Sequence, residues 1–311
     1  MKKTIILFIL ISILSYLLFN RLGIENTGFD LINTSVPREL IMSGGPAKDG
    51  IPSLDNPKFT FASNASFLHD TDRVLAIQFQ GITKAYPIKI MNYHEVVNDN
   101  FNGHAVAITF CPLCRSGIAY SANIQGKKHS FGVSGLLYNS DVLLYDRETE
   151  SLWSQIMSTA ISGALKGYQL TTIPMQNTTW KDWKQQHPNT LVLSSETGYR
   201  RDYSSNPYSG YELDNSILFP VAAQDNRYHP KSLVLGIKID GKFKAYPFSE
   251  LEKIETELKD EFANQDLVIR YDKQHQNAQV LNSQGKALPS VVTFWFAWYA
   301  FHPEGIVFTH K

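Results

Sequence analysis

Two stretches of the chain repeat one another at a spacing of 160 residues, and this repeat limits the possible folds more than any other feature. Residues 74–87 and 234–247 both show an apolar strand pattern, a tight turn at Gly and a second short strand that ends in Ala-Tyr-Pro. The pattern W-x-x-W-x-x-x-H-P also occurs twice, at residues 180–188 and 295–303. The chain is therefore predicted to contain two copies of one unit.

The two copies differ in length. From Lys84 to Trp180 there are 96 positions, whereas from Lys244 to Trp295 there are 51. Short strand patterns alternate with helix patterns, and the spacing of Leu251, Ile254 and Leu258 (the second copy's Tyr-Pro helix) is typical of one buried helical face. The predicted fold is α+β, with two related, unequal sheet-plus-helix units from an internal duplication, after an N-terminal membrane anchor.

Composition shifts along the chain predict its organisation. Segments rich in Gly, Pro, Asn and Ser lie before and between the repeats and indicate irregular structure. The predicted parts are a signal anchor or signal peptide (1–23), an extended wrapping segment (24–72), a first unit with the candidate site (73–195) and its insertion (136–178), a connector (196–230) and a second, degenerate unit (231–311).

The N-terminus carries a targeting pattern. Lys2 and Lys3 precede an apolar run over residues 4–19, with no convincing small-residue cleavage site after it. We expect a single-pass membrane protein with its N-terminus inside and its bulk extracytoplasmic, so that the membrane is its first partner. The alternative is a secreted or periplasmic protein after signal cleavage.

Charge and composition exclude some function classes. The chain has 29 Lys+Arg and 29 Asp+Glu, which gives a formal net charge of +0 and argues against nucleic acid as a partner. Apolar residues make up 43% and charged residues 19%, as in globular proteins with a sizeable core. Two cysteines are too few for a disulfide framework.

The two cysteines form the strongest chemical motif. A predicted strand over residues 105–110 runs directly into Cys111-Pro-Leu-Cys114, and the second copy has Tyr271 and Gln274 at the same offset. His94 also occurs only in the first copy. The sequence predicts a metal site with Cys111, Cys114 and His94 as ligands, for copper or zinc before iron, with an open position for catalysis or metal handling.

Two other functions fit the same motif. A Cys-x-x-Cys pair in an exported protein is also typical of a thiol-disulfide oxidoreductase, although here residues 115–120 resemble a turn and a strand, not a helix start. The pair is also compatible with a structural disulfide in a binding or assembly module that lacks enzymatic activity. The substrate is open in every case.

The insertion of the first copy supplies further candidate residues. Asp141 and Asp146 are candidate acid-base groups or orienting carboxylates, and Arg147 is a candidate binding group for an anionic substrate. Taken alone, these residues also fit turns and a solvated hairpin loop. The tryptophan pairs and Glu95 have counterparts in the copy without cysteines, so the tryptophans are predicted to be core residues and Glu95 carries little functional signal.

Several long motifs together resemble one known family. The bacterial and archaeal proteins grouped as domain of unknown function 3179 are similar in the segments 93–99 (Tyr-His-Glu-Val-Val-Asn-Asp), 110–114, 134–141, 144–147 and 151–155. The likeness extends from about Pro37 to the C-terminus. It implies an N-terminal signal or anchor, as members commonly carry one, and it implies no assigned activity.

Overall fold

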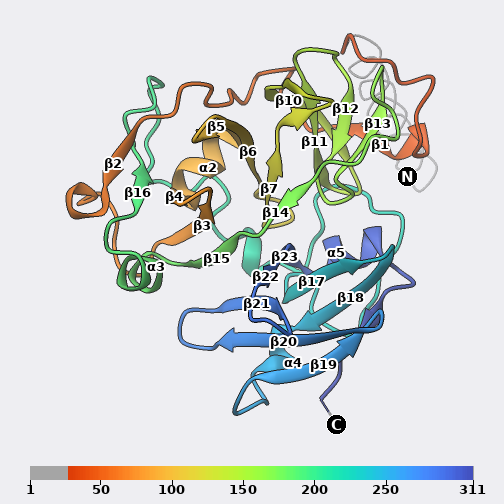
Figure 1. Ribbon diagram of the computed structural model, residues 1–311. Helices are drawn as coiled ribbons and strands as arrows, with labels where there is room; N and C mark the ends of the chain where they lie inside the picture. Colours follow the sequence, from red (N-terminus) through yellow and green to blue (C-terminus); the bar gives the residue numbers. More distant parts are fainter. Residues whose placement is uncertain (1–26, 311) are drawn as a thin grey trace, which may run out of the picture.

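The computed structural model describes residues 27–310, and these form a mostly β protein (Figure 1). Strands account for 41% and helices for 12%, and five sheets of four or five strands form a five-bladed, propeller-like arrangement. The predicted α+β class with two sheet-plus-helix units is therefore wrong. The helices that follow each Tyr-Pro are too short to form a layer of their own, and the β-branched runs after them form further strands.

The five sheets are called blades 1 to 5 here. In order across each sheet, blade 1 contains β15 (Gln176–Thr179), β3 (Arg73–Phe79), β4 (Ile82–Pro87), β16 (Leu191–Leu193) and β2 (Phe59–Phe61). Blade 2 contains β14 (Thr172–Ile173), β7 (Ser116–Ser121), β6 (His104–Cys111) and β5 (Val96–Phe101). Blade 3 contains β1 (Ile41–Ser43), β10 (Phe131–Tyr138), β11 (Asp141–Asp146), β12 (Leu152–Ser154) and β13 (Thr159–Ser162).

The last two blades come from the C-terminal part of the chain. Blade 4 contains β23 (Ser290–Phe294), β17 (Leu233–Ile239), β18 (Lys242–Pro247) and β24 (Ile306–Val307). Blade 5 contains β19 (Leu258–Phe262), β20 (Gln265–Asp272), β21 (Asn277–Asn282) and β22 (Ala287–Leu288). A small hairpin of β8 (Asn123–Ile124) and β9 (Lys127–Lys128) follows blade 2 in the sequence.

The repeated sequence segments occupy matching places in different blades. Val74 pairs with Pro87 in blade 1, and Val234 pairs with Pro247 in blade 4. The strand order β15-β3-β4-β16 of blade 1 has the same sequence motifs as β23-β17-β18-β24 of blade 4. Blade 3 has no such counterpart, because most of its strands come from the extra residues of the first repeat.

The helices of the described residues are short. They are α2 (Ile88–His94), α3 (Trp180–Gln186), α4 (Phe248–Leu251) and α5 (Trp295–Phe301), with 3-10 turns η1 (Arg38–Leu40), η2 (Ala62–Asn64) and η3 (Tyr211–Leu213). Helix α4 ends before Ile254, and Leu258 already begins β19, so the helix expected from their spacing is wrong. The four tryptophans of α3 and α5 are buried core residues, as predicted.

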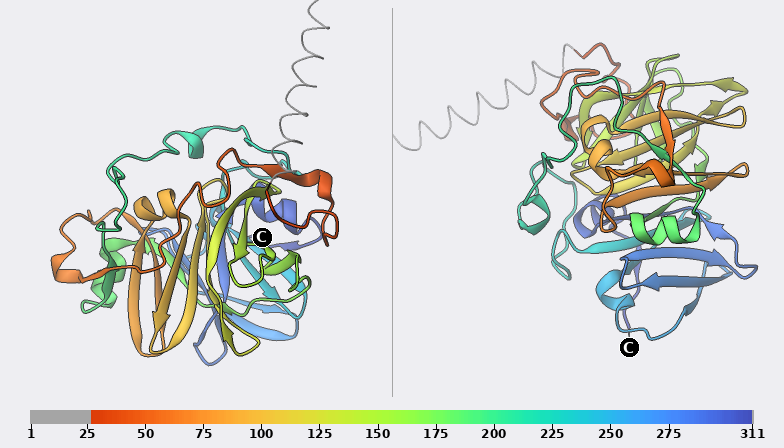
Figure 2. Two further views of the ribbon diagram at one scale, coloured as in Figure 1. Left: turned by 90° about the horizontal axis from the view of Figure 1, so that it is seen from above. Right: turned by 90° about the vertical axis from the view of Figure 1, so that its left-hand side faces the viewer.

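Two long segments without much regular structure cover the blades. Residues 27–72 contribute β1 to blade 3 and β2 to blade 1, so they tie two blades together. Residues 196–230 run along the outside of the molecule between the two repeated regions (Figure 2). These two segments lie over the strand ends at which the candidate site is found.

The predicted membrane anchor over residues 1–23 lies outside the described residues. Between residues 27 and 310 no helix is long and apolar enough to cross a bilayer. The longest helices there have seven residues, about 10 Å at 1.5 Å per residue, against an apolar bilayer core of about 30 Å. The prediction of a single-pass membrane protein with the membrane as its partner is therefore not borne out by the described residues.

Candidate functional site

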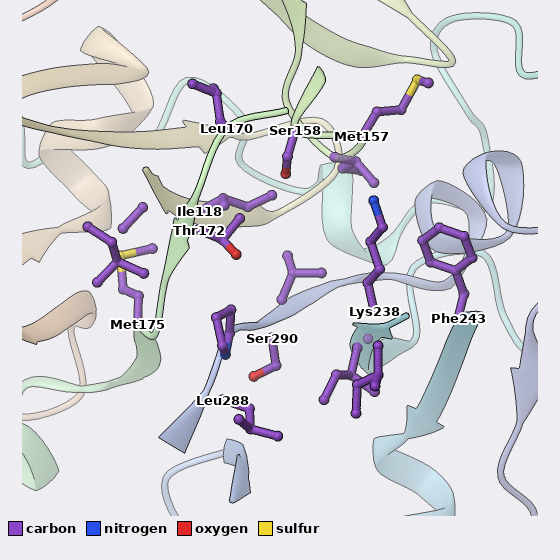
Figure 3. Close-up of a pocket in the computed structure, with 18 of the residues that line it drawn as sticks. Ile118, Met157, Ser158, Leu170, Thr172, Met175, Lys238, Phe243, Leu288 and Ser290 are labelled. Atoms are coloured by element: carbon purple, nitrogen blue, oxygen red, sulfur yellow. The ribbon is translucent and has the colours of Figure 1, made fainter. Parts of the chain in front are cut away.

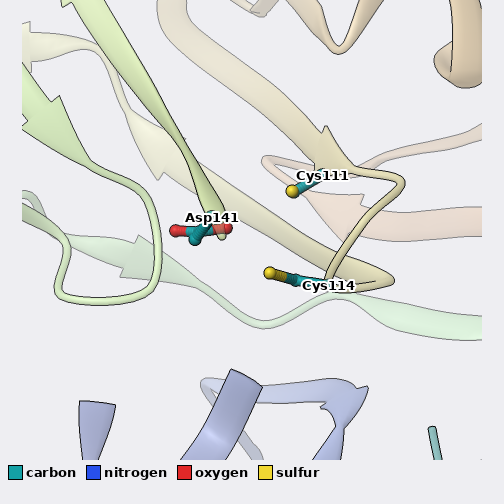
Figure 4. A group of neighbouring side chains, drawn as sticks. All are labelled: Cys111, Cys114 and Asp141. Carbon is teal, nitrogen blue, oxygen red and sulfur yellow. The ribbon is translucent and has the colours of Figure 1, made fainter. Parts of the chain in front are cut away.

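The two cysteines lie where β6 turns into β7. Cys111 is the last residue of β6 and pairs with Ser116 at the start of β7, so Cys114 sits inside the turn. Arg115 closes this turn with a φ of 55°, in the left-handed region. Both thiols are free, and Figure 4 shows their sulfurs on the side that faces Asp141, the first residue of β11.

The ligand atoms of Cys111, Cys114 and Asp141 all lie within 4.8 Å of one another. These three residues are called the thiol-carboxylate group here. Cys114 Sγ donates to the backbone O of Ser140 over 3.3 Å, and Ile156 N donates to Asp141 Oδ2 over 3.1 Å. The structure thus brings one of the insertion residues predicted from the sequence to the cysteines.

The thiol-carboxylate group is fully buried, and burial sets its protonation. Burial removes water from Asp141 and raises its pKa to about 7. Hydrogen bonds from Ile156 N and from the two thiols favour the charged form and offset part of this rise. Burial likewise raises the pKa of Cys111, and it raises that of Cys114 well above its ordinary value. When the group holds no cation, both thiols therefore keep their protons at neutral pH and Asp141 is only partly ionised.

Glu95 is a further buried carboxyl that the sequence did not single out. It follows α2 with a φ of 57°, a left-handed position that Gly or Asn usually takes at a helix end. Its backbone O accepts from Phe110 N over 2.7 Å, next to Cys111. Burial, followed by repulsion from Asp141, raises the pKa of Glu95 to about 8. The one signal for Glu95 in the sequence is its residue type, because Gly or Asn is usual at such a helix end.

His94 is not part of the thiol-carboxylate group. Its Nδ1 lies 2.7 Å from the backbone O of Pro52 and its Nε2 lies 2.6 Å from the hydroxyl of Tyr203. Its ring also contacts those of Tyr199 and Tyr203. His94 therefore joins the wrapping segment to the connector, and the structure does not bring it to the cysteines as a ligand.

Asp146 and Arg147 also lie outside the thiol-carboxylate group. Buried Asp146 accepts from Trp153 Nε1 over 2.9 Å and from both the N–H and the hydroxyl of Thr149, and it lies 3.2 Å from His129 Nδ1. Arg147 donates to Asp55 and Ser53 of the wrapping segment. These contacts hold the end of β11 and the wrapping segment in place.

The connector covers the cysteines. Tyr211 belongs to the buried core cluster that contains Cys111 and Cys114, and Tyr208 packs against the same cluster. Buried Lys231 fixes this part of the connector, since its Nζ donates to the backbone O of Tyr211, Asp214 and Ser216 over 3.0, 3.1 and 2.9 Å. The ammonium also lies 3.4 Å from the centre of the Tyr211 ring.

Among residues 27–310, two buried hydroxyls near the thiols have no hydrogen-bond partner. Ser140 Oγ belongs to the residue whose backbone O accepts from the thiols, and Tyr211 Oη belongs to the covering ring. Buried polar groups are normally paired, so unpaired ones at one place indicate room for a ligand, an ion or water.

Strand pairing changes the alignment of the two repeats at the cysteines. Cys111 pairs with Ser116 in blade 2, and Asp272 pairs with Asn277 in blade 5. The counterparts of Cys111 and Cys114 are thus Asp272 and His275, one position beyond the predicted Tyr271 and Gln274. His275 Nδ1 lies 2.7 Å from Asp272 Oδ2 and 3.9 Å from Asp182 Oδ1, so a different set of titratable residues has replaced the thiols in the second repeat.

Fold and site together define a propeller-like β protein with a buried pair of thiols beside a carboxylate. The sequence model of the family described as "Protein of unknown function (DUF3179)" matches residues 48–305, and the chain belongs to this family. The resemblance expected from the motifs is thereby confirmed. No curated protein and no solved structure matches the chain.

Proposed function

We propose that the protein binds one thiophilic divalent metal ion through Cys111, Cys114 and Asp141. Two thiolates and one carboxylate are ligands that zinc accepts in proteins, and the carboxylate favours zinc over copper(I). Three protein ligands leave one position for water, a substrate or a further residue. Glu95, which interacts with Asp141, is the buried carboxyl available beside this position.

The observation that carries the proposal is the convergence of buried acidic groups without a cation. The sulfurs and the carboxylate lie within 4.8 Å of one another, and all three residues are buried. Within residues 27–310 no Lys, Arg or His forms an ion pair with Asp141, although other buried carboxylates of this chain, such as Asp99 with Lys84, have one. A bound dication would supply the missing charge and stabilise the thiolates.

The thiol environment supports metal binding over thiol exchange. Reactive thiols have lowered pKa values and lie at helix N-termini or beside cations. Here burial raises both thiol pKa values, and the cysteines lie in a turn between two strands. A dication compensates the cost of deprotonation, whereas an exchange reaction at neutral pH has no such compensation.

The proposal is tested by metal analysis of the full-length protein and its variants. We expect about one equivalent of zinc in the wild type and loss of zinc in Cys111→Ser and in Asp141→Asn. His94→Gln serves as the matched comparison, because His94 is a neighbouring buried residue that lies outside the group; it should keep the metal. A wild-type protein without metal, with two free thiols or a disulfide, would contradict the proposal, and circular dichroism shows whether each variant folds.

A further inference from the structure

A cavity of about 380 Å³ lies between blades 2, 3, 4 and 5. Its walls come from β7 and β14, from the loop after β12, from β17, β18 and β23, from β20 and β22 of blade 5, and from α5 (Figure 3). Cys111, Cys114, Asp141 and Glu95 are not among its lining residues. The cavity is therefore a separate candidate site, and its size lies in the range of small-molecule pockets.

The cavity wall combines apolar and polar side chains. The apolar side chains come from blades 2, 4 and 5 and from the segments around blade 3, and they include Ile118, Ile156, Leu170, Met175, Leu288 and Val291. The ring of Trp298 forms part of the wall and packs directly on the backbone of Gly236, where a Cβ atom would collide with it. An apolar ligand body buried against such walls gains free energy in proportion to the area removed from water.

One cation lines this cavity, the ammonium of the solvent-exposed Lys238. Figure 3 shows Lys238 of β17 with its ammonium in the cavity, near the loop that carries Ser158. Lys238 Nζ donates to Gln169 Oε1 over 3.3 Å and forms no ion pair with any residue in the described range 27–310. The single carboxylate among the lining residues is Asp240, in the exposed turn after β17.

The other polar groups of the cavity are neutral. His302 is stacked on Phe243 at 3.8 Å between ring centres, and burial lowers the pKa of His302 to about 3, so its ring is uncharged at neutral pH. The hydroxyls of Ser158, Thr172 and Ser290 and the amides of Gln169 and Gln265 complete the polar lining. Neutral hydroxyls beside one ammonium match a small anion with one negative charge, because they add hydrogen bonds without further positive charge.

We propose that this cavity binds a monocarboxylate with an apolar body. The carboxylate lies at Lys238, and the apolar body lies against Ile118, Ile156 and Leu170. Medium-chain fatty acids and aryl-alkanoates belong to this chemical class. The proposal is independent of metal binding, since the cavity and the thiol-carboxylate group share no lining residue.

Calorimetric titration of the full-length protein with decanoate, below its micellar concentration, tests this proposal. We expect saturable binding at one site with a negative heat-capacity change, because apolar surface is buried. Decanol and decyltrimethylammonium, which carry the same chain with no charge or a positive one, should bind at least tenfold more weakly. Equal binding of all three, or no saturable binding of decanoate, would overturn the proposal.

Two variants locate the binding. Lys238→Met should weaken decanoate binding at least tenfold, whereas Lys242→Met, an exposed lysine of the same hairpin that does not line the cavity, should change it less than twofold. Ser290→Phe should fill the cavity and abolish binding while circular dichroism stays unchanged. Unchanged binding in Lys238→Met would overturn the proposal.

Zinc content should be the same in Lys238→Met as in the wild type, so failure of the cavity proposal is distinguishable from failure of the metal site.

Discussion

The backbone N–H of Ile156 donates to Asp141 Oδ2 over 3.1 Å, and Ile156 also lines the cavity between blades 2, 3, 4 and 5. One residue of the loop after β12 thus contacts both candidate sites. It orients the carboxylate toward the thiols on one side and presents an apolar surface on the other. The insertion of the first repeat supplies this loop and Asp141, whereas the cysteines and the rest of the cavity wall come from other parts of the chain.

The metal-free protein should lose stability as pH rises. Burial raises the pKa of Asp141 from 3.8 to about 7 and that of Glu95 from 4.5 to about 8. For each carboxyl, the folded state therefore binds more protons than the unfolded state at pH values between its ordinary and its raised pKa. Stability is then fully present below about pH 4 and declines up to about pH 8. Each pKa unit corresponds to about 1.4 kcal/mol, which gives a loss of several kcal/mol for the pair.

Urea unfolding of chelator-treated protein at pH 5 and pH 8 measures this dependence. In Asp141→Asn the loss between the two pH values should shrink, because one titrating carboxyl is gone. Zinc should restore stability at pH 8 in the wild type and leave the variant unchanged. A wild type that is equally stable at both pH values without metal would contradict this assignment of the buried carboxyls.

Asp146 is expected to act on stability and not on metal binding. Asp146→Ala leaves Trp153 Nε1 and the Thr149 N–H without their buried acceptor, which should cost roughly 2–4 kcal/mol in the free energy of unfolding. Zinc per folded protein should stay at the wild-type value. A variant of normal stability that loses zinc would instead place Asp146 in the metal site.

Lys231 should control access to the cysteines. Lys231→Met removes the ammonium that holds three carbonyls of the connector, including that of Tyr211 from the core cluster of the cysteines. We expect modification of the metal-free thiols by a disulfide reagent to become at least tenfold faster under native conditions. Lys253→Met, at an exposed lysine of blade 4's helix end, is the control and should react at the wild-type rate.

Gly236 is expected to tolerate no larger residue. A Cβ there would occupy the space of the Trp298 ring, and overpacking in a filled core costs about 1–3 kcal/mol. Gly236→Ala should therefore lower the urea midpoint and shift the fluorescence of Trp298. Ala76 takes the matching ladder position of the first repeat, and Ala76→Gly should cost about 1 kcal/mol or less. Equal midpoints for Gly236→Ala and the wild type would refute the close packing.

Some features of the fold follow from local sequence alone. The two hairpins that end in Ala-Tyr-Pro and the short tryptophan helices were predictable, because alternation of apolar residues and Gly turns act within a few residues. The fold class was not. Leu251, Ile254 and Leu258 have helical spacing, yet only Phe248–Leu251 is helical, because Leu258 pairs with Ile269 in blade 5. Such pairing depends on residues distant in the sequence.

The candidate site was predictable only in part, because it also combines residues that are distant in the sequence. Cys111 and Cys114 are close because they share one turn, and Asp141 reaches them because β11 begins beside that turn, which only the packing of blade 3 determines. His94 was expected as a ligand because of its absence from the second repeat. In the structure its nitrogens are occupied by Pro52 and Tyr203, from segments whose path has no periodic signal in the sequence.

X-ray absorption at the zinc edge of the full-length, zinc-loaded protein tests the central claim most directly. The account predicts one zinc per chain with two sulfur neighbours at about 2.3 Å and oxygen neighbours at about 2.0–2.2 Å. Cys111→Ser should reduce the sulfur count or abolish binding. A zinc shell made only of nitrogen and oxygen, or a protein that retains no zinc, would contradict the account.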